Sequence, residues 1–102
     1  EELRPIYDAL LFAINKFGDD ITITPKKTSV SIIRKKQFVL IKPATKTRID
    51  LGLKLKDVPM TNRLENSGPF GSMCTHRVKV TSVDNVDDQL TDWMQQAYLQ
   101  SV

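Results

Sequence analysis

The chain has very few of the residues that build disulfides and zinc sites. Its 102 residues include one cysteine, Cys74, and one histidine, His76. A single thiol excludes an internal disulfide, and one Cys with one His excludes a zinc site made only of those ligands within one chain. Because a lone thiol fits a reducing compartment, we expect a cytoplasmic protein.

Long apolar runs and common catalytic motifs are also missing. No apolar run approaches the roughly 18 residues that span a bilayer, so no membrane partner is expected. The start lacks the basic and apolar regions of a signal peptide, and it lacks an initiator Met, which indicates a trimmed or excised chain. Residues 68–71 hold two glycines, but Pro69 has no N–H to donate to a phosphate. With no His-Glu-x-x-His motif, paired carboxylates or nucleophile elbow, we expect no cofactor and do not favour an enzyme.

Positive charge is present in abundance, and it is concentrated in the middle of the chain. Residues 21–81 hold thirteen of the fifteen basic residues against three acidic ones, a net +10. Residues 1–20 carry −3 and residues 82–102 carry −4, which leaves the overall +3. A basic stretch of this kind indicates an anionic partner such as a nucleic acid, a nucleotide or an acidic protein surface.

Apolar residues at helical spacing mark both ends of the chain. Residues 3–17 form one such stripe, with Pro5 in the first turn and Gly18 as a stop signal. A second stripe runs from Val86 to Tyr98, with Asp87 placed in its first turn. Three preceding residues are candidate caps for this second helix: Ser82, Asp84 and Asn85.

The middle of the chain predicts short strands. They cover residues 21–24, 28–34, 38–42, 48–55 and 74–80. Their short links favour antiparallel pairing, because a parallel pair needs a longer crossover. Residues 56–73 are rich in turn formers, and loops of that length tend to be functional or mobile. We therefore predict a single two-layer α+β domain over residues 1–102, with an antiparallel sheet of four to five strands and both terminal helices on one face.

Alternation along 48–55 and 74–80 gathers charge on the sheet face that points away from the helices. If that face is open, it forms a basic surface around Asp50, and the opposing interpretation is an ordinary solvated sheet face. Gly52, inside a regular strand, indicates a close approach by a loop side chain or by a ligand. Two basic clusters lie at strand ends, where lysine also protects sheet edges. The candidate ligand-binding residues are Lys26, Lys27, Arg34, Lys36, Arg48, Asp50, Gly52, Lys54, His76, Arg77 and Lys79.

Cys74 and His76 are two residues apart on a predicted strand and should face the same side. A Cys/His pair is the minimum for thiol catalysis. Both residues are expected on the apolar face with Val78, where an inert thiol and a neutral core histidine are favoured. A general base formed by His76 and Asp50 would need a bulge, because their strand phases are opposite.

Several segments together resemble a known family. They are Arg-Pro-Ile-Tyr at 4–7, Thr-Pro-Lys-Lys at 24–27, Arg-Lys-Lys-Gln-Phe at 34–38, Asp-Leu-Gly-Leu-Lys-Leu at 50–55 and Cys-Thr-His-Arg-Val at 74–78. With the final Ala97-Tyr98 they resemble a family of bacterial domains of unknown function, domain of unknown function 5655, which is similar to the YdhG-like and YjbR-like small α+β domains. The resemblance implies a compact module that occurs alone or at the C-terminal end of longer proteins. It implies no established activity, so no catalytic residue is carried over.

Three functional hypotheses follow. The first is a non-enzymatic module that binds an anionic partner through the basic sheet face. The second is an enzyme acting on a small anionic substrate near His76, Asp50 and Arg77. The third is a structural or assembly domain that pairs through its sheet, as a homodimer or fused to another domain.

Overall fold

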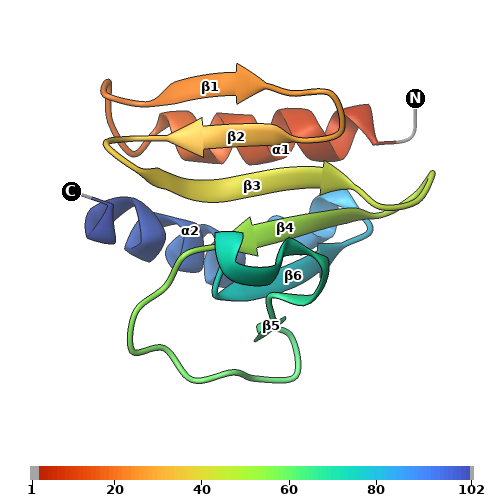
Figure 1. Cartoon of the computed structure of the whole chain (residues 1–102). Coiled ribbons are helices and arrows are strands. Elements are labelled where there is room, and N and C mark those ends of the chain that lie inside the picture. The colour runs from red at the N-terminus through yellow and green to blue at the C-terminus, as the bar shows by residue number, and fades with distance from the viewer. Residues whose placement is uncertain (1–2, 102) are drawn as a thin grey trace.

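Two α-helices cover one face of a six-stranded antiparallel sheet in residues 3–101, the part of the chain that a computed structural model describes (Figure 1). The elements are α1 (Arg4–Asn15), β1 (Thr22–Pro25), β2 (Val30–Ile33), β3 (Gln37–Pro43), β4 (Ile49–Leu53), β5 (Glu65–Asn66), the 3₁₀ turn η1 (Gly68–Met73), β6 (His76–Val80), the 3₁₀ turn η2 (Val83–Asn85) and α2 (Asp88–Gln100). The predicted α+β class is confirmed. The sheet has one strand more than the upper expectation, because the two-residue β5 forms inside the irregular segment 56–73.

The sheet runs in the order β1-β2-β3-β4-β6-β5, and every neighbouring pair is antiparallel. In the centre, Leu51 of β4 lies opposite Ile41 of β3 and Val78 of β6. These three side chains are buried on the helix side, as the alternation in the sequence predicts. Between residues of this kind, the polar side chains of the same strands point to the opposite face.

One hydrophobic core joins both helices to the sheet. Ile6, Leu10 and Ile14 project from α1 at helical spacing and are buried in it. Trp93 and Met94 belong to the group of buried α2 residues that completes this core. Figure 1 shows α1 and α2 behind the sheet, with the η1 turn in front of it. The predicted placement of both helices on one face is confirmed. Within residues 3–101, no helix combines the length and apolarity that crossing a bilayer requires.

The cap of α2 differs from the prediction. Asp87 is the N-cap, and its Oδ1 accepts a hydrogen bond from the Leu90 N–H at 3.0 Å. Ser82 and Asn85 instead form a capping box around η2, and Asp84 lies in the first turn of η2. The three predicted caps were assigned to the wrong helix because the chain makes this separate 3₁₀ turn before α2 begins.

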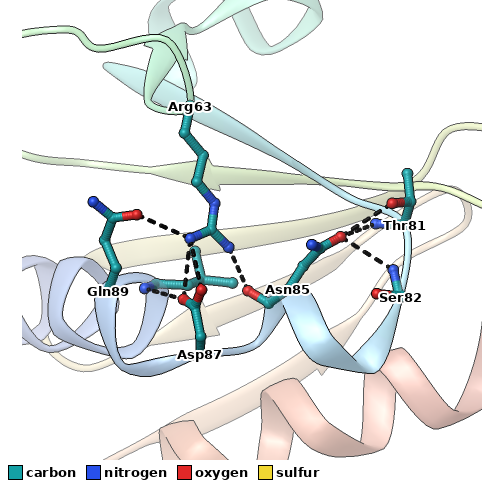
Figure 2. Close-up of polar contacts among 7 residues, drawn as sticks. Arg63, Thr81, Ser82, Asn85, Asp87 and Gln89 are labelled. Atoms are coloured by element: carbon teal, nitrogen blue, oxygen red, sulfur yellow. Dashed lines mark hydrogen bonds and ion pairs between the residues drawn. The ribbon is translucent and has the colours of Figure 1, made fainter.

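The long segment 56–73 is fastened to the start of α2 by Arg63 (Figure 2). Its Nη1 donates to both carboxylate oxygens of Asp87 and to Oε1 of Gln89, each at 3.0 Å. Its Nη2 donates to the carbonyl oxygen of Asn85. The guanidinium also lies 5.8 Å from the centre of the Trp93 ring. A segment that the sequence marks as irregular is therefore anchored by charge-assisted hydrogen bonds at its middle.

A second polar cluster joins three distant parts of the chain at the C-terminal end of α2. The hydroxyl of Tyr98 donates to Oδ1 of Asp20 at 2.6 Å, and Nε of Arg34 donates to Oδ2 at 2.8 Å. Arg34 also donates from Nη1 to the Tyr98 carbonyl at 3.0 Å, and its guanidinium stacks 4.1 Å from the centre of the Tyr98 ring. The hydrogen bond from Tyr98 is the largest cause that lowers the pKa of Asp20 below its ordinary value of 3.8, and the hydrogen bond from Arg34 is the second.

We predict that Tyr98→Phe raises the pKa of Asp20 toward 3.8, because its largest stabilising hydrogen bond is lost. A carboxylate with a depressed pKa stabilises the fold above its unfolded pKa and loses that effect as the pH falls. The variant should therefore lose less stability than the wild type on acidification below pH 3.8.

Carboxyl carbon NMR titration measures this pKa directly. Asp87 is the internal control, because its pKa is lowered by the Leu90 N–H and by Arg63, far from Tyr98. An unchanged Asp20 pKa in the variant would contradict the assignment.

Candidate anion-binding site

The central sheet face opposite the helices collects several of the predicted residues. Asp50 and Gly52 lie on β4, and the register places them directly opposite Lys79 and Arg77 of β6. Lys42 of β3 is the neighbour of Asp50 on the other side. The alternation in the sequence therefore brings these side chains to one face.

Three of the cations on this face, Arg48, Arg77 and Lys79, share two carboxylates. Asp50 is 3% exposed, and its oxygens lie 3.1 Å from Nε of Arg48 and 3.7 Å from Nη1 of Arg77. Glu65 of β5 accepts a hydrogen bond from Nη2 of Arg77 at 3.1 Å and lies 3.7 Å from Nζ of Lys79. Because Arg48, Arg77 and Lys79 each have a carboxylate neighbour, this part of the face forms an internal ion-pair network.

The η1 turn packs directly against the same face at Gly52. Phe70 and Cys74 form a small buried cluster there with Leu40 of β3. A Cβ atom on Gly52 would lie 2.5 Å from Sγ of Cys74 and 3.0 Å from Cδ2 of Phe70. The sequence predicted that either a loop side chain or a ligand approaches Gly52 closely, and the structure shows loop side chains there.

Gly68 allows the same turn to close over Arg77. Its φ of 53° lies in the left-handed region that favours glycine, and a Cβ there would lie 2.7 Å from the Arg77 guanidinium carbon. The guanidinium is therefore held between the sheet and the backbone of the turn. This contact leaves Arg77 only partly exposed and limits how it can meet a ligand.

The expected common side for Cys74 and His76 is wrong. Cys74 packs on the face of Gly52, whereas His76 pairs with Leu53 in register and shares the helix side with Val78. The reason is that β6 begins at His76 and the chain bends at Thr75, so strand alternation does not extend back to Cys74.

Both nitrogens of the buried His76 ring are engaged in holding the chain. Nε2 lies 3.0 Å from the carbonyl oxygen of Val58, and Nδ1 lies 2.8 Å from Oγ1 of Thr75. Because a carbonyl can only accept, Nε2 carries a proton and donates to Val58. His76 thus ties the segment 56–73 to β6, and it lies on the opposite side of the sheet from Asp50, so the structure does not bring this proposed base and carboxylate together.

Burial controls the chemistry of Cys74. It raises the pKa of the thiol to about 11, against the opposing effect of the nearby Lys54 charge. The thiol is therefore protonated at neutral pH, which disfavours nucleophilic chemistry. Within residues 3–101, no group of three or more Cys, His, Asp or Glu side chains is placed to hold a metal ion.

A lysine-lined hollow opens at the end of the sheet where β3 begins and β4 ends. It has a volume of about 230 Å³ and is lined by Lys36, Lys54, Leu55, Lys56, Cys74, Thr75 and Gln100. We call it the lysine hollow. Lys36 and Lys54 were among the candidate residues, and Lys56 was missed. The signal for Lys56 was its position two residues after Lys54, which places both side chains on one side of an extended segment.

Backbone hydrogen bonds fix the walls of the lysine hollow. The Lys54 N–H donates to the Phe38 carbonyl at 3.2 Å, and the Lys56 N–H donates to Oε1 of Gln100 at 2.7 Å. Oγ1 of Thr75 accepts from the Leu55 N–H at 2.7 Å. The backbone that carries these lysines is therefore positioned before any ligand arrives.

The remaining candidates lie elsewhere. Lys26 and Lys27 occupy the β1–β2 connection, at the opposite end of the sheet from the β2–β3 connection that carries Lys36. Arg34 belongs to the cluster around Asp20 and Tyr98. The eleven candidates thus divide among the ion-pair network, the lysine hollow, an exposed turn and structural contacts.

We predict that Cys74 resists alkylation by iodoacetamide in the folded protein at neutral pH. The rate should rise with pH toward the pKa of about 11, since the thiolate is the reactive form. Mass spectrometry of timed samples measures the alkylation rate, and the unfolded protein in urea is the fast-reacting control. Rapid alkylation of the folded chain at neutral pH would contradict the burial of this thiol.

We also predict that Gly52→Ala destabilises the domain by about 1–3 kcal/mol, the usual cost of overpacking a close contact. Urea unfolding measures this change. Adding Cys74→Ala should recover part of the loss, because Sγ is the nearest atom to the new methyl group. A neutral Gly52→Ala, or fully additive effects in the double variant, would show that η1 does not pack here.

Comparison with known proteins bears on the family and not on the site. The model of the family described as Domain of unknown function (DUF5655) matches residues 1–101. No curated protein matches the chain, and no solved structure does. The family resemblance noted in the sequence is thus confirmed, and the chain belongs to the DUF5655 family.

Proposed function

We propose that this domain is a non-enzymatic module that binds a small phosphate-bearing ligand in the lysine hollow. The observation that supports it best is the convergence of Lys36, Lys54 and Lys56 on one concave site, which no acidic side chain among residues 3–101 lines. Three ammonium groups around a hollow raise the local positive potential and attract an anion. Lysine acts in such sites as a mobile point charge for phosphate.

The pairing of charges distinguishes this hollow from the rest of the basic face. Arg48, Arg77 and Lys79 have carboxylate neighbours within ion-pair distance. Within residues 3–101, the three lysines of the hollow form no such pair. An anion entering the hollow would relieve the repulsion among them without breaking an existing ion pair.

Size favours a compact anionic group over a large ligand body. The volume of about 230 Å³ is below the usual range of drug-sized ligand sites. A phosphate or diphosphate group fits this description, and the body of a nucleotide would extend outside the hollow. A nucleic acid would contact it only through single backbone phosphates.

The test is titration with pyrophosphate at low and high salt, followed by amide NMR shifts. We expect the shifts to centre on residues 54–56 and 74–75, and the affinity to fall as salt rises. The triple variant Lys36→Gln, Lys54→Gln and Lys56→Gln should weaken binding about tenfold or more, as the loss of three exposed ion pairs implies.

A matched control separates a site from general charge. The triple variant Lys26→Gln, Lys27→Gln and Lys35→Gln removes the same charge from exposed turns, and it should bind pyrophosphate like the wild type. Equal losses in both triple variants would overturn the proposal in favour of non-specific attraction. Adenosine diphosphate, duplex DNA and RNA form further arms; tighter binding of DNA or RNA than of pyrophosphate would identify a nucleic-acid surface instead.

A further inference from the structure

A larger cavity lies between α1 and the sheet, at the opposite end of β3 and β4 from the lysine hollow. It has a volume of about 670 Å³ and is lined by Leu3, Arg4, Tyr7, Val30, Ile41, Pro43, Lys46 and Ile49. Figure 1 shows that α1 begins at the end of the sheet where β3 passes into β4. The cavity is bounded by the first turns of α1, the start of β2, the end of β3 and the start of β4.

The interior of this cavity is apolar. Ile41 and Ile49 are buried and form part of the hydrophobic core, and they reach the cavity from neighbouring strands. Tyr7 and Val30 are only half-buried, so the cavity is open to solvent on their side. Its volume falls within the range of about 300–1,000 Å³ that is typical of small-molecule sites.

Two basic residues among the lining give the cavity a charged mouth. Lys46, in the β3–β4 connection, is exposed and makes no ion pair within residues 3–101. Nε of Arg4 lies 3.1 Å from Oδ1 of Asp8, which is one turn further along α1, and both side chains are exposed. An exposed pair of this kind is weak, so Arg4 can turn to a ligand, while Lys46 supplies a charge that no carboxylate of residues 3–101 pairs with.

We propose that this cavity binds an amphipathic carboxylate, with its apolar chain between α1 and the sheet and its head group at Lys46 and Arg4. An apolar lining and a cationic mouth favour a ligand that has an apolar chain at one end and a negative charge at the other. A fully polar anion would leave the apolar walls unused, and an apolar cation would be repelled at the mouth. The inference is independent of the lysine hollow, with which this cavity shares no lining residue.

Decanoate is a suitable probe, with decanol and decyltrimethylammonium as matched ligands of the same chain length. Amide NMR titration of the full chain should show decanoate shifts at Val30, Ile41 and Ile49. Decanol should bind more weakly than decanoate, and decyltrimethylammonium more weakly still. No binding of decanoate, shifts outside the cavity, or equal affinities for the three probes would overturn the proposal.

Two pairs of variants test the chain and head contacts separately. Val30→Phe places a larger side chain in the cavity and should abolish binding, whereas Val83→Phe makes the same change at an exposed residue outside it. Lys46→Gln should lower the affinity for decanoate about two- to fivefold and leave the affinity for decanol unchanged, as expected for one exposed ion pair. Lys35→Gln is its control and should have no effect.

The second pair keeps the proposal testable even if Val30→Phe fails to fold. A Lys46→Gln variant that binds decanoate like the wild type would refute the head-group contact. The triple variant of the lysine hollow should bind decanoate normally, so the two proposed sites can fail independently.

Discussion

The close packing of the η1 turn on Gly52 determines how the outer face of the sheet is used. Glycine at this position lets Cys74 and Phe70 reach the β4 backbone, and together with Leu40 they form a small second core on that face. At the base of the turn, Gly68 lets the backbone pass close over Arg77, because it has no Cβ to meet the guanidinium. A face that would otherwise be open and basic is divided by this contact.

The division gives similar residues different roles. On one side of η1, Arg48, Arg77 and Lys79 each lie within ion-pair distance of Asp50 or Glu65, in a partly buried network. Networks of this kind fix geometry more than they attract ligands, because each cation already has a carboxylate neighbour. At the other end, three lysines remain around a hollow and keep their positive potential. Positive charge alone therefore does not distinguish the two regions; the positions of the carboxylates do.

Much of the fold was predictable from the pattern of residues. The alternation of Ile49, Leu51 and Leu53 fixed the inward face of β4, and the spacing of Ile6, Leu10 and Ile14 identified α1. The candidate site was predicted less well. Lys36 and Lys54, two of the predicted residues, line the lysine hollow, but Glu65 was not counted against the basic face because it lies in a segment without periodicity. Cys74 was placed on the wrong side, since nothing local shows that the strand begins only at His76.

The sequence by itself determined the α+β class, the antiparallel pairing, the two core-facing helices and the charge of the middle segment. These depend on periodicity, turn residues and composition, which act over a few residues. Only the tertiary structure decided which cations meet carboxylates, where η1 lies, and that two hollows open at opposite ends of β3 and β4. Those outcomes depend on contacts between residues far apart in the chain, such as Arg63 with Asp87 and Tyr98 with Asp20. No local pattern encodes such a contact, because each partner is exposed or buried according to where the other elements pack.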